Sequence, residues 1–173
     1  MRAIMCCVLI LLVAPVFAQW KENGEPIPDT EWRKSSGEFG VMLLLTDDPE
    51  RFMKDWEKPE TPNLVTAEVA ERGKPIMAFL FFTGCKEVDG VCNATADFTV
   101  YRPDGSEYAS EKAAELWKEK PAPPGDNIQM SVANIGIRIE PNDPRGKYRV
   151  KAVAHDVNAL RSITVEQTFT VEK

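Results

Sequence analysis

The sequence contains few of the residues that build common active sites. It has one histidine in 173 residues, and it has no glycine-rich loop of the kind that cradles phosphates. Its basic residues do not cluster, because they are interleaved with acidic ones, as in Lys118-Glu119-Lys120. These absences argue against nucleotide and nucleic-acid binding and against histidine-based catalysis. The composition therefore argues against these classes of function and does not by itself indicate another.

Long apolar runs are also scarce, and the one that stands out lies at the N-terminus. Arg2 precedes an apolar run from Cys6 to Val13, and Val16-Phe17-Ala18 ends in a small-residue cleavage pattern. This order predicts a signal peptide over residues 1–18, cleaved after Ala18, and a periplasmic or secreted mature chain. No later stretch reaches the roughly 20 apolar residues of a membrane helix, so we expect no membrane insertion of the mature chain.

The charge balance of the mature chain is acidic. Removing the signal peptide takes away one basic residue of 21 and none of the 27 acidic residues, so the net charge is 20 − 27 = −7. An acidic, solvated surface does not attract polyanions, so we expect no nucleic-acid partner. About 155 residues are enough for one hydrophobic core. We therefore expect a polar N-terminal arm over residues 19–38 and one domain over residues 39–173.

Two cysteines, Cys85 and Cys92, remain after the signal peptide is removed. An even pair in an oxidising compartment predicts a disulfide. Asp89-Gly90 lies between them and is a strong signal for a tight turn, so the cysteines are expected to face each other across a hairpin connection. The spacing is wider than the Cys-x-x-Cys of thiol exchange catalysts. The bond is interpreted as a structural staple that contributes about 2–3 kcal/mol.

The first structured elements should be a strand and a short helix. Residues 39–45 form a continuous apolar run of strand length. Asp48 can cap a helix that begins with Pro49, and the spacing of Phe52 and Trp56 gives that helix one apolar stripe. We expect the helix over residues 49–57, ended by the prolines that follow.

Alternating apolar and polar residues dominate the rest of the chain. They predict strands over residues 65–70, 76–83, 96–101, 135–140, 148–154 and 163–171. Residues 110–120 are interpreted as a second short helix that ends before Pro121. About seven or eight strands at turn spacing, with one or two short helices, predict a mainly β fold: an immunoglobulin-like antiparallel β-sandwich.

Two turns carry a resemblance to a known fold family. Residues 143–150 read Asp-Pro-Arg-Gly-Lys-Tyr-Arg-Val, and Pro103-Asp104-Gly105 marks an earlier turn. The first resembles the G-x-Y-x-V hairpin of bacterial exported immunoglobulin-like and macroglobulin-type β-sandwich domains, and the second is similar to their PDG turn. The resemblance spans residues 65–171. It implies a binding or spacer module, and no thioester motif accompanies it.

No catalytic, cofactor-binding or metal-binding residue is assigned from the sequence. His155 precedes Asp156, a pair that could orient an imidazole, but no nucleophile motif accompanies it. The two cysteines of the expected disulfide are not available as zinc ligands. Glu68, Glu71 and Asp97 are carboxylates that a small hydrolase could use, although the sequence does not set their separation.

The four tryptophans, Trp20, Trp32, Trp56 and Trp117, lie outside the expected strands. They either cap the ends of the sandwich or contact a ligand or partner. We therefore expect a non-enzymatic interaction module of the periplasm or cell envelope, whose partner is an envelope or extracellular protein. The alternatives are a carbohydrate-binding module that uses exposed tryptophans and a small hydrolase with carboxylate catalysis.

Overall fold

The computed structural model describes residues 20–22, 25–59, 62, 64–124 and 127–172, so the predicted signal peptide lies outside the described residues. The fold is mainly β, with one helix in the described part. In chain order, the elements are β1 (Lys21–Glu22), β2 (Glu25–Pro26), β3 (Arg33–Ser36), β4 (Phe39–Thr46), α1 (Pro49–Trp56), β5 (Val69–Ala70), β6 (Pro75–Thr83), β7 (Glu87–Val88), β8 (Val91–Tyr101), β9 (Glu107–Lys120), β10 (Gln129–Met130), β11 (Ile135–Arg138), β12 (Gly146–Asp156) and β13 (Arg161–Val171).

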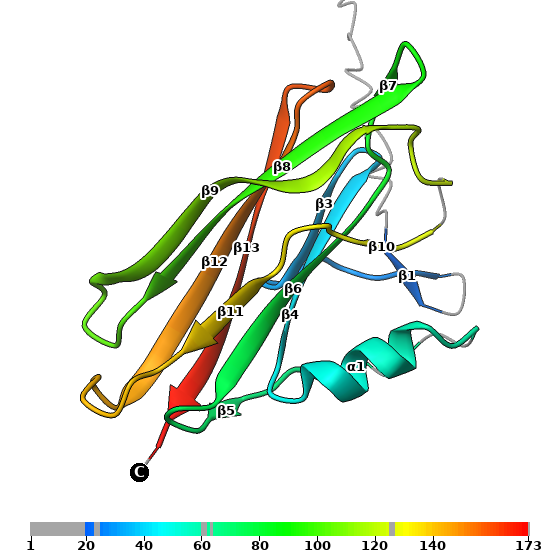
Figure 1. Cartoon of the computed structure of the whole chain (residues 1–173). Coiled ribbons are helices and arrows are strands. Elements are labelled where there is room, and N and C mark those ends of the chain that lie inside the picture. Colours follow the sequence, from blue (N-terminus) through cyan, green and yellow to red (C-terminus); the bar gives the residue numbers. More distant parts are fainter. Residues whose placement is uncertain (1–19, 23–24, 60–61, 63, 125–126, 173) are drawn as a thin grey trace, which may run out of the picture.

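Two sheets face each other as a β-sandwich (Figure 1). The five-stranded sheet runs β3-β4-β6, and β10 and β11 both pair with the far edge of β6. The six-stranded sheet runs β5-β13-β12-β8, with β7 and β9 paired to β8. Its strands are antiparallel except for β5, which runs parallel to β13. The expected sandwich is therefore confirmed at the level of two packed sheets.

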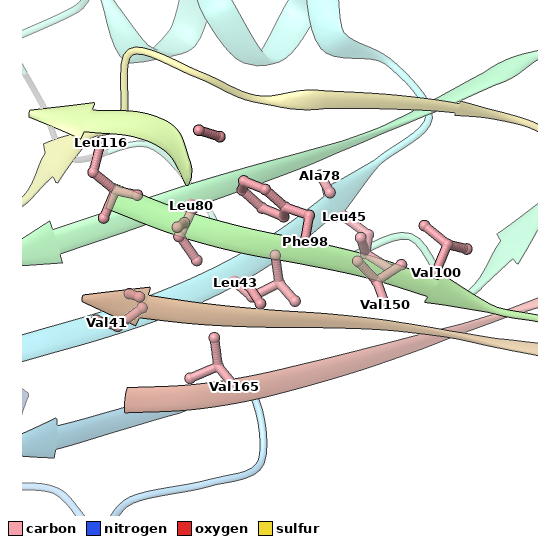
Figure 2. Close-up of a cluster of buried hydrophobic side chains, with 14 of the residues drawn as sticks. Val41, Leu43, Leu45, Ala78, Leu80, Phe98, Val100, Leu116, Val150 and Val165 are labelled. Atoms are coloured by element: carbon pink, nitrogen blue, oxygen red, sulfur yellow. The ribbon is translucent and has the colours of Figure 1, made fainter. Parts of the chain in front are cut away.

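The main core lies between the two sheets, and Figure 2 shows the aliphatic side chains at its centre. Strand β4 contributes Val41, Leu43 and Leu45, which are fully buried. Strand β8 contributes Phe98 and Val100 from the opposite sheet. Because side chains of a strand alternate between its two faces, these residues fall on one side of each sheet.

The five-stranded sheet is buried on its other face as well. Met42, Leu44, Phe79 and Phe81 project from β4 and β6 into a second cluster with helix α1. The ring of Phe52 in α1 stacks on Phe79 with centroids 4.8 Å apart. Burial on both faces explains why β4 and β6 are continuous apolar runs without alternation.

Helix α1 begins as the sequence predicts. The Asp48 side chain accepts a hydrogen bond from the Arg51 N–H (3.0 Å), and Pro49 occupies the first turn. Trp56, one turn after Phe52, packs on Phe81 with centroids 5.0 Å apart. The apolar stripe of the helix therefore covers the outer face of the five-stranded sheet.

Cys85 and Cys92 form the expected disulfide, with their Cα atoms 6.1 Å apart. Between them, β7 pairs with the start of β8 through Asp89 and Gly90, which both have positive φ. Positive φ at both central residues is the geometry of a tight hairpin turn, which explains the Asp-Gly dipeptide.

Two segments differ from the sequence-based expectation. The helix predicted over residues 110–120 is wrong, because this segment belongs to the 14-residue strand β9. Residues 65–68, predicted to be strand, form only the approach to the short β5.

The segment expected to be a polar arm contributes an edge strand to the sandwich, because β3 pairs with β4. Ahead of that strand, Trp20 is buried and its Nε1 donates to the Lys34 carbonyl (3.1 Å). None of the helices in the described part of the chain is long and apolar enough to cross a membrane.

Candidate functional site

The four tryptophans do not form one surface. Trp20, Trp32 and Trp56 belong to the cluster on the outer face of the five-stranded sheet. Trp117 lies on β9, where its ring packs edge-on against Phe82 and its Nε1 donates to the Pro121 carbonyl (2.9 Å). Trp20 is buried and the other three are half-buried. Their side chains act mainly as packing groups, and the expectation that they lie outside the strands is wrong for Trp117.

His155 and Asp156 do not act together, because successive side chains of β12 point to opposite faces. Asp156 is buried and accepts hydrogen bonds from the Lys86 N–H (2.9 Å) and the Ala159 N–H (3.0 Å). It therefore anchors the turn between β12 and β13 to the disulfide loop and leaves His155 without an orienting carboxylate from its neighbour.

His155 instead meets other groups on the outer face of the six-stranded sheet. Its Nδ1 lies 2.8 Å from Ser162 Oγ, and its Nε2 lies 3.9 Å from the Asp97 carboxylate. That second distance is too long for a hydrogen bond, so Asp97 does not fix the imidazole. Asp97 accepts from the Ala113 N–H, which lowers its pKa. The three residue types of a catalytic triad are present, but the contact that would orient the base is missing.

The carboxylates considered for hydrolysis are far apart in the topology. Glu68 and Glu71 flank β5 at one edge of the six-stranded sheet, while Asp97 lies on β8, beyond β13 and β12. Glu71 is paired with Lys74 (2.6 Å). The fold therefore does not bring Asp97 together with the other two as a catalytic pair. The described residues also contain no group of three or more side chains suited to a metal ion.

One side of the sandwich is closed by hydrogen bonds between the sheets. The Glu166 N–H of β13 donates to the Glu31 carbonyl, just before β3 (2.7 Å). The Arg161 side chain of β13 also donates to the Ser36 carbonyl of β3. Along this side the two sheets are joined.

The opposite side is open between β9 and β11 (Figure 1). Within the described residues, β9 pairs only with β8 and β11 only with β6, so both strands present an unpaired edge. A cavity of about 320 Å³ lies between them, and a second hollow of about 600 Å³ continues from it past Glu111. We call this opening the β9–β11 slot. Its lining residues are Val100, Tyr108, Ala109, Ser110, Glu111, Ala113, Ala114, Glu115, Ala133, Asn134, Ile135, Gly136, Ile137 and Arg138.

The slot has an apolar floor and small side chains along its walls. Val100 and Ile137 are buried at its base. Alanines line much of the β9 side, and Ala133 and Gly136 are the small residues of the opposite side. On β9, the five residues from Ala109 to Ala113 are all exposed. Small wall residues over an apolar base leave room for the side chains of an occupant, as in most protein binding sites.

Hydrogen bonds close both ends of the slot. At one end, the N–H groups of Val132 and Ala133 donate to β9 carbonyls, at 3.1 and 2.8 Å. At the other, the Tyr108 hydroxyl lies 2.8 Å from the Arg138 carbonyl and 2.7 Å from the Asp143 carboxylate. The slot therefore has a defined length along β9.

The electrostatics of the Tyr108 end favour a neutral phenol. Burial, together with the Asp143 carboxylate, raises the pKa of Tyr108 to about 12. Hydrogen bonds from the Tyr108 hydroxyl and the Glu140 N–H hold the pKa of Asp143 below its usual value. The Arg102 guanidinium lies over the Tyr108 ring, 4.7 Å from its centroid. At neutral pH the Tyr108 hydroxyl therefore stays protonated. It fixes this end of the slot as a hydrogen-bond donor and does not act as a general acid or base.

Sequence reasoning missed this slot because it assigned most of β9 to a helix. A usable signal was present: the Pro103-Asp104-Gly105 turn follows a strand, and a tight turn returns the chain antiparallel to that strand. In the structure, β8 and β9 are joined through this turn.

Neither the protein-family models nor the curated proteins that were searched match this chain. Among solved structures, a family 123 glycoside hydrolase from Clostridium perfringens is similar, with TM-score 0.43 and 14% identity over 77% of this chain and 27% of that one. The alkylpurine DNA glycosylase AlkC from Pseudomonas fluorescens has TM-score 0.43 and 13% identity over 79% of this chain and 31% of that one. A Niemann-Pick type C2 protein from Japanese carpenter ant has TM-score 0.41 and 12% identity over 75% and 89%.

Proposed function

We propose that this chain is an exported, non-enzymatic binding module whose partner is an envelope or extracellular protein. The partner contributes an extended segment that adds to the outer edge of β9 and lays its side chains into the β9–β11 slot. The observation that carries this proposal is the exposed stretch from Ala109 to Ala113, whose outer edge pairs with no other strand of the described chain, beside a cavity with an apolar floor.

An added strand fits this site better than a rigid small molecule does. An edge strand offers backbone donors and acceptors at a regular spacing, which is the surface that β-augmentation uses. The alternate side chains of such a segment would reach the apolar floor at Val100 and Ile137, and backbone hydrogen bonds would supply the affinity.

Export is supported by the disulfide between Cys85 and Cys92, because disulfides persist mainly in oxidising compartments. The signal-peptide pattern of residues 1–18 points to the same compartment. The two alternatives have less support: the tryptophans needed for carbohydrate binding are buried or half-buried, and Asp97 is separated by two strands from Glu68 and Glu71.

A crosslinker placed in the slot tests the proposal. Ala109 lines the slot and pairs with the buried Val100, so its side chain faces the slot. Ser162, which is also exposed, lies on β13 at the other side of the six-stranded sheet and serves as the control. Each is replaced in turn by a photoreactive benzoylphenylalanine in the chain from Gln19 to Lys173, and the variants are irradiated in envelope extract of the source organism. We expect the substitution at Ala109, and not the one at Ser162, to crosslink to one contiguous segment of a partner protein.

The crosslinked segment is then made as a synthetic peptide, and amide hydrogen exchange of the chain is measured with and without it. Slower exchange of residues 109–112 supports the proposal, because these amides then lie under an added strand. Equal crosslinking at both positions, no crosslink, or a crosslink to glycan contradicts it. A crosslink to a second copy of the chain replaces the proposed partner with self-association.

A further inference from the structure

Glu111 is the one charged side chain of β9 that the register directs into the slot. It pairs across the ladder with Phe98, whose side chain is fully buried between the sheets. Directly paired residues of neighbouring strands project from the same face, so Glu111 faces inward. The next residue, Lys112, points to the outer face, where it meets Asp97 at 3.5 Å.

The Glu111 carboxylate has no partner among the described residues. No ion pair or side-chain hydrogen bond of the described chain includes it, whereas the nearby Glu115 is paired with Lys120 at 3.7 Å. Arg138 lies on the opposite wall, but it follows the inward-facing Ile137, so strand alternation turns its side chain to the other face. Glu111 therefore stands in the middle of the slot with its charge unmatched, and it lines both hollows.

We infer that the slot selects a strand that carries a lysine or arginine opposite Glu111, flanked by apolar residues that reach the floor. This inference rests on the proposed function. An occupant that covers Glu111 removes water from its carboxylate, and a buried charge without a partner is strongly unfavourable. A cation in the occupant compensates that loss, while a neutral or acidic residue at the same place does not. The Glu111 carboxylate thus favours strands with a cation at this position over strands with a neutral or acidic residue there.

Two designed peptides test this inference: acetyl-Thr-Val-Thr-Lys-Thr-Val-Thr-amide and the same peptide with glutamate in place of lysine. In an extended conformation, both present valine, the charged residue and valine on one face. Their affinities are measured without a label, by isothermal titration calorimetry, and their site by amide exchange of residues 109–112. We expect the wild-type chain to bind the lysine peptide about tenfold more tightly than the glutamate peptide.

Three variants separate a specific role of Glu111 from a general effect of charge. Glu111→Lys reverses the preference, and Glu111→Gln reduces it to about twofold or less. Glu172→Lys makes the same change of net charge at an exposed glutamate that follows β13, at the opposite edge of the six-stranded sheet, and leaves the preference unchanged.

The outcomes distinguish this inference from the proposed function. If both peptides protect residues 109–112 with equal affinity, the charge selection is overturned and the strand-binding proposal stands. If the Glu172→Lys control changes the preference as much as Glu111→Lys, the selection is due to net charge and the inference is overturned. If neither peptide protects residues 109–112 at millimolar concentration, the proposed function and the inference both fail.

Discussion

Single carboxylates fix several of the turns of this sandwich. Asp48 caps α1, Asp156 binds two backbone N–H groups beside the disulfide loop, and Asp143 accepts from the Glu140 N–H in the turn before β12. Each of these carboxylates binds at least one backbone N–H group and so fixes the path of the chain at its turn. Asp143 differs from the other two because it also receives the Tyr108 hydroxyl and so joins the β12 turn to the end of the slot.

The raised pKa of Tyr108 predicts a loss of stability in alkali. Its pKa is about 12 in the folded chain against a reference value of 10.0, so folding favours the neutral phenol. That stabilisation is complete below about pH 10 and is lost as the pH rises from 10 towards 12. We expect the free energy of urea unfolding to fall more between pH 9 and pH 11.5 for the wild type than for Tyr108→Phe. Parallel curves for the two proteins would contradict the assignment.

At the scale of elements, β9 shows how pairing overrides local preference. Its Glu, Lys and Ala residues favour a helix, which is why the sequence alone predicts one there. In the fold, β9 pairs with β8 instead, with register shifts, and Leu116 is fully buried against the opposite sheet. Burial of β9 against this core outweighs a propensity difference of a few tenths of a kcal/mol per residue.

The backbone conformation of Ala113, at one of the register shifts of β9, predicts a stabilising substitution. Ala113 has φ +52°, a conformation in which the Cβ atom is unfavourable and which glycine adopts freely. We expect Ala113→Gly to raise the free energy of unfolding by about 0.5–1 kcal/mol. The matched control is Ala114→Gly, which should lower it by a similar amount because Ala114 is not among the positive-φ residues. Denaturant unfolding measures both, and a loss of stability in Ala113→Gly would show that the Cβ atom is not strained there.

At the scale of the whole molecule, the five-stranded sheet joins two hydrophobic clusters and the sandwich is asymmetric. One face of that sheet packs against the six-stranded sheet, and the other carries α1 and the segment around Trp20. Hydrogen bonds close the β3–β13 side, while the β9–β11 side stays open. The open side is therefore accessible without disturbing either cluster, which supports the binding site that we propose there.

The five-stranded sheet belongs to both hydrophobic clusters, and the N-terminal segment packs on its outer face. We therefore expect this segment to contribute to the stability of the whole domain. Trp20 is 6% exposed and belongs to the outer cluster. We expect Trp20→Ala to lower the free energy of unfolding by about 3 kcal/mol, whereas Trp20→Phe, which keeps most of the apolar volume, should cost less. Unfolding is followed by circular dichroism. An unchanged unfolding midpoint in Trp20→Ala would support the independent arm that the sequence suggested.

The sequence by itself determined the features that depend on near neighbours. Alternation of apolar residues defines β12 and β13, the Asp48-Pro49 pair starts α1, and Asp89-Gly90 closes the turn between the two cysteines. These signals are local, since strand period, helix capping and tight turns each depend on a few consecutive residues.

The tertiary structure decided everything that depends on which strands become neighbours. It turned residues 110–120 into an edge strand, placed Asp156 in the interior and His155 on the surface, and buried Trp20 against the five-stranded sheet. It also left one edge of β9 and one edge of β11 without a partner strand in the described chain, beside a common cavity that Glu111 lines. The physical reason is that edge pairing and burial arise from contacts between residues far apart in the chain, and no local pattern specifies those contacts.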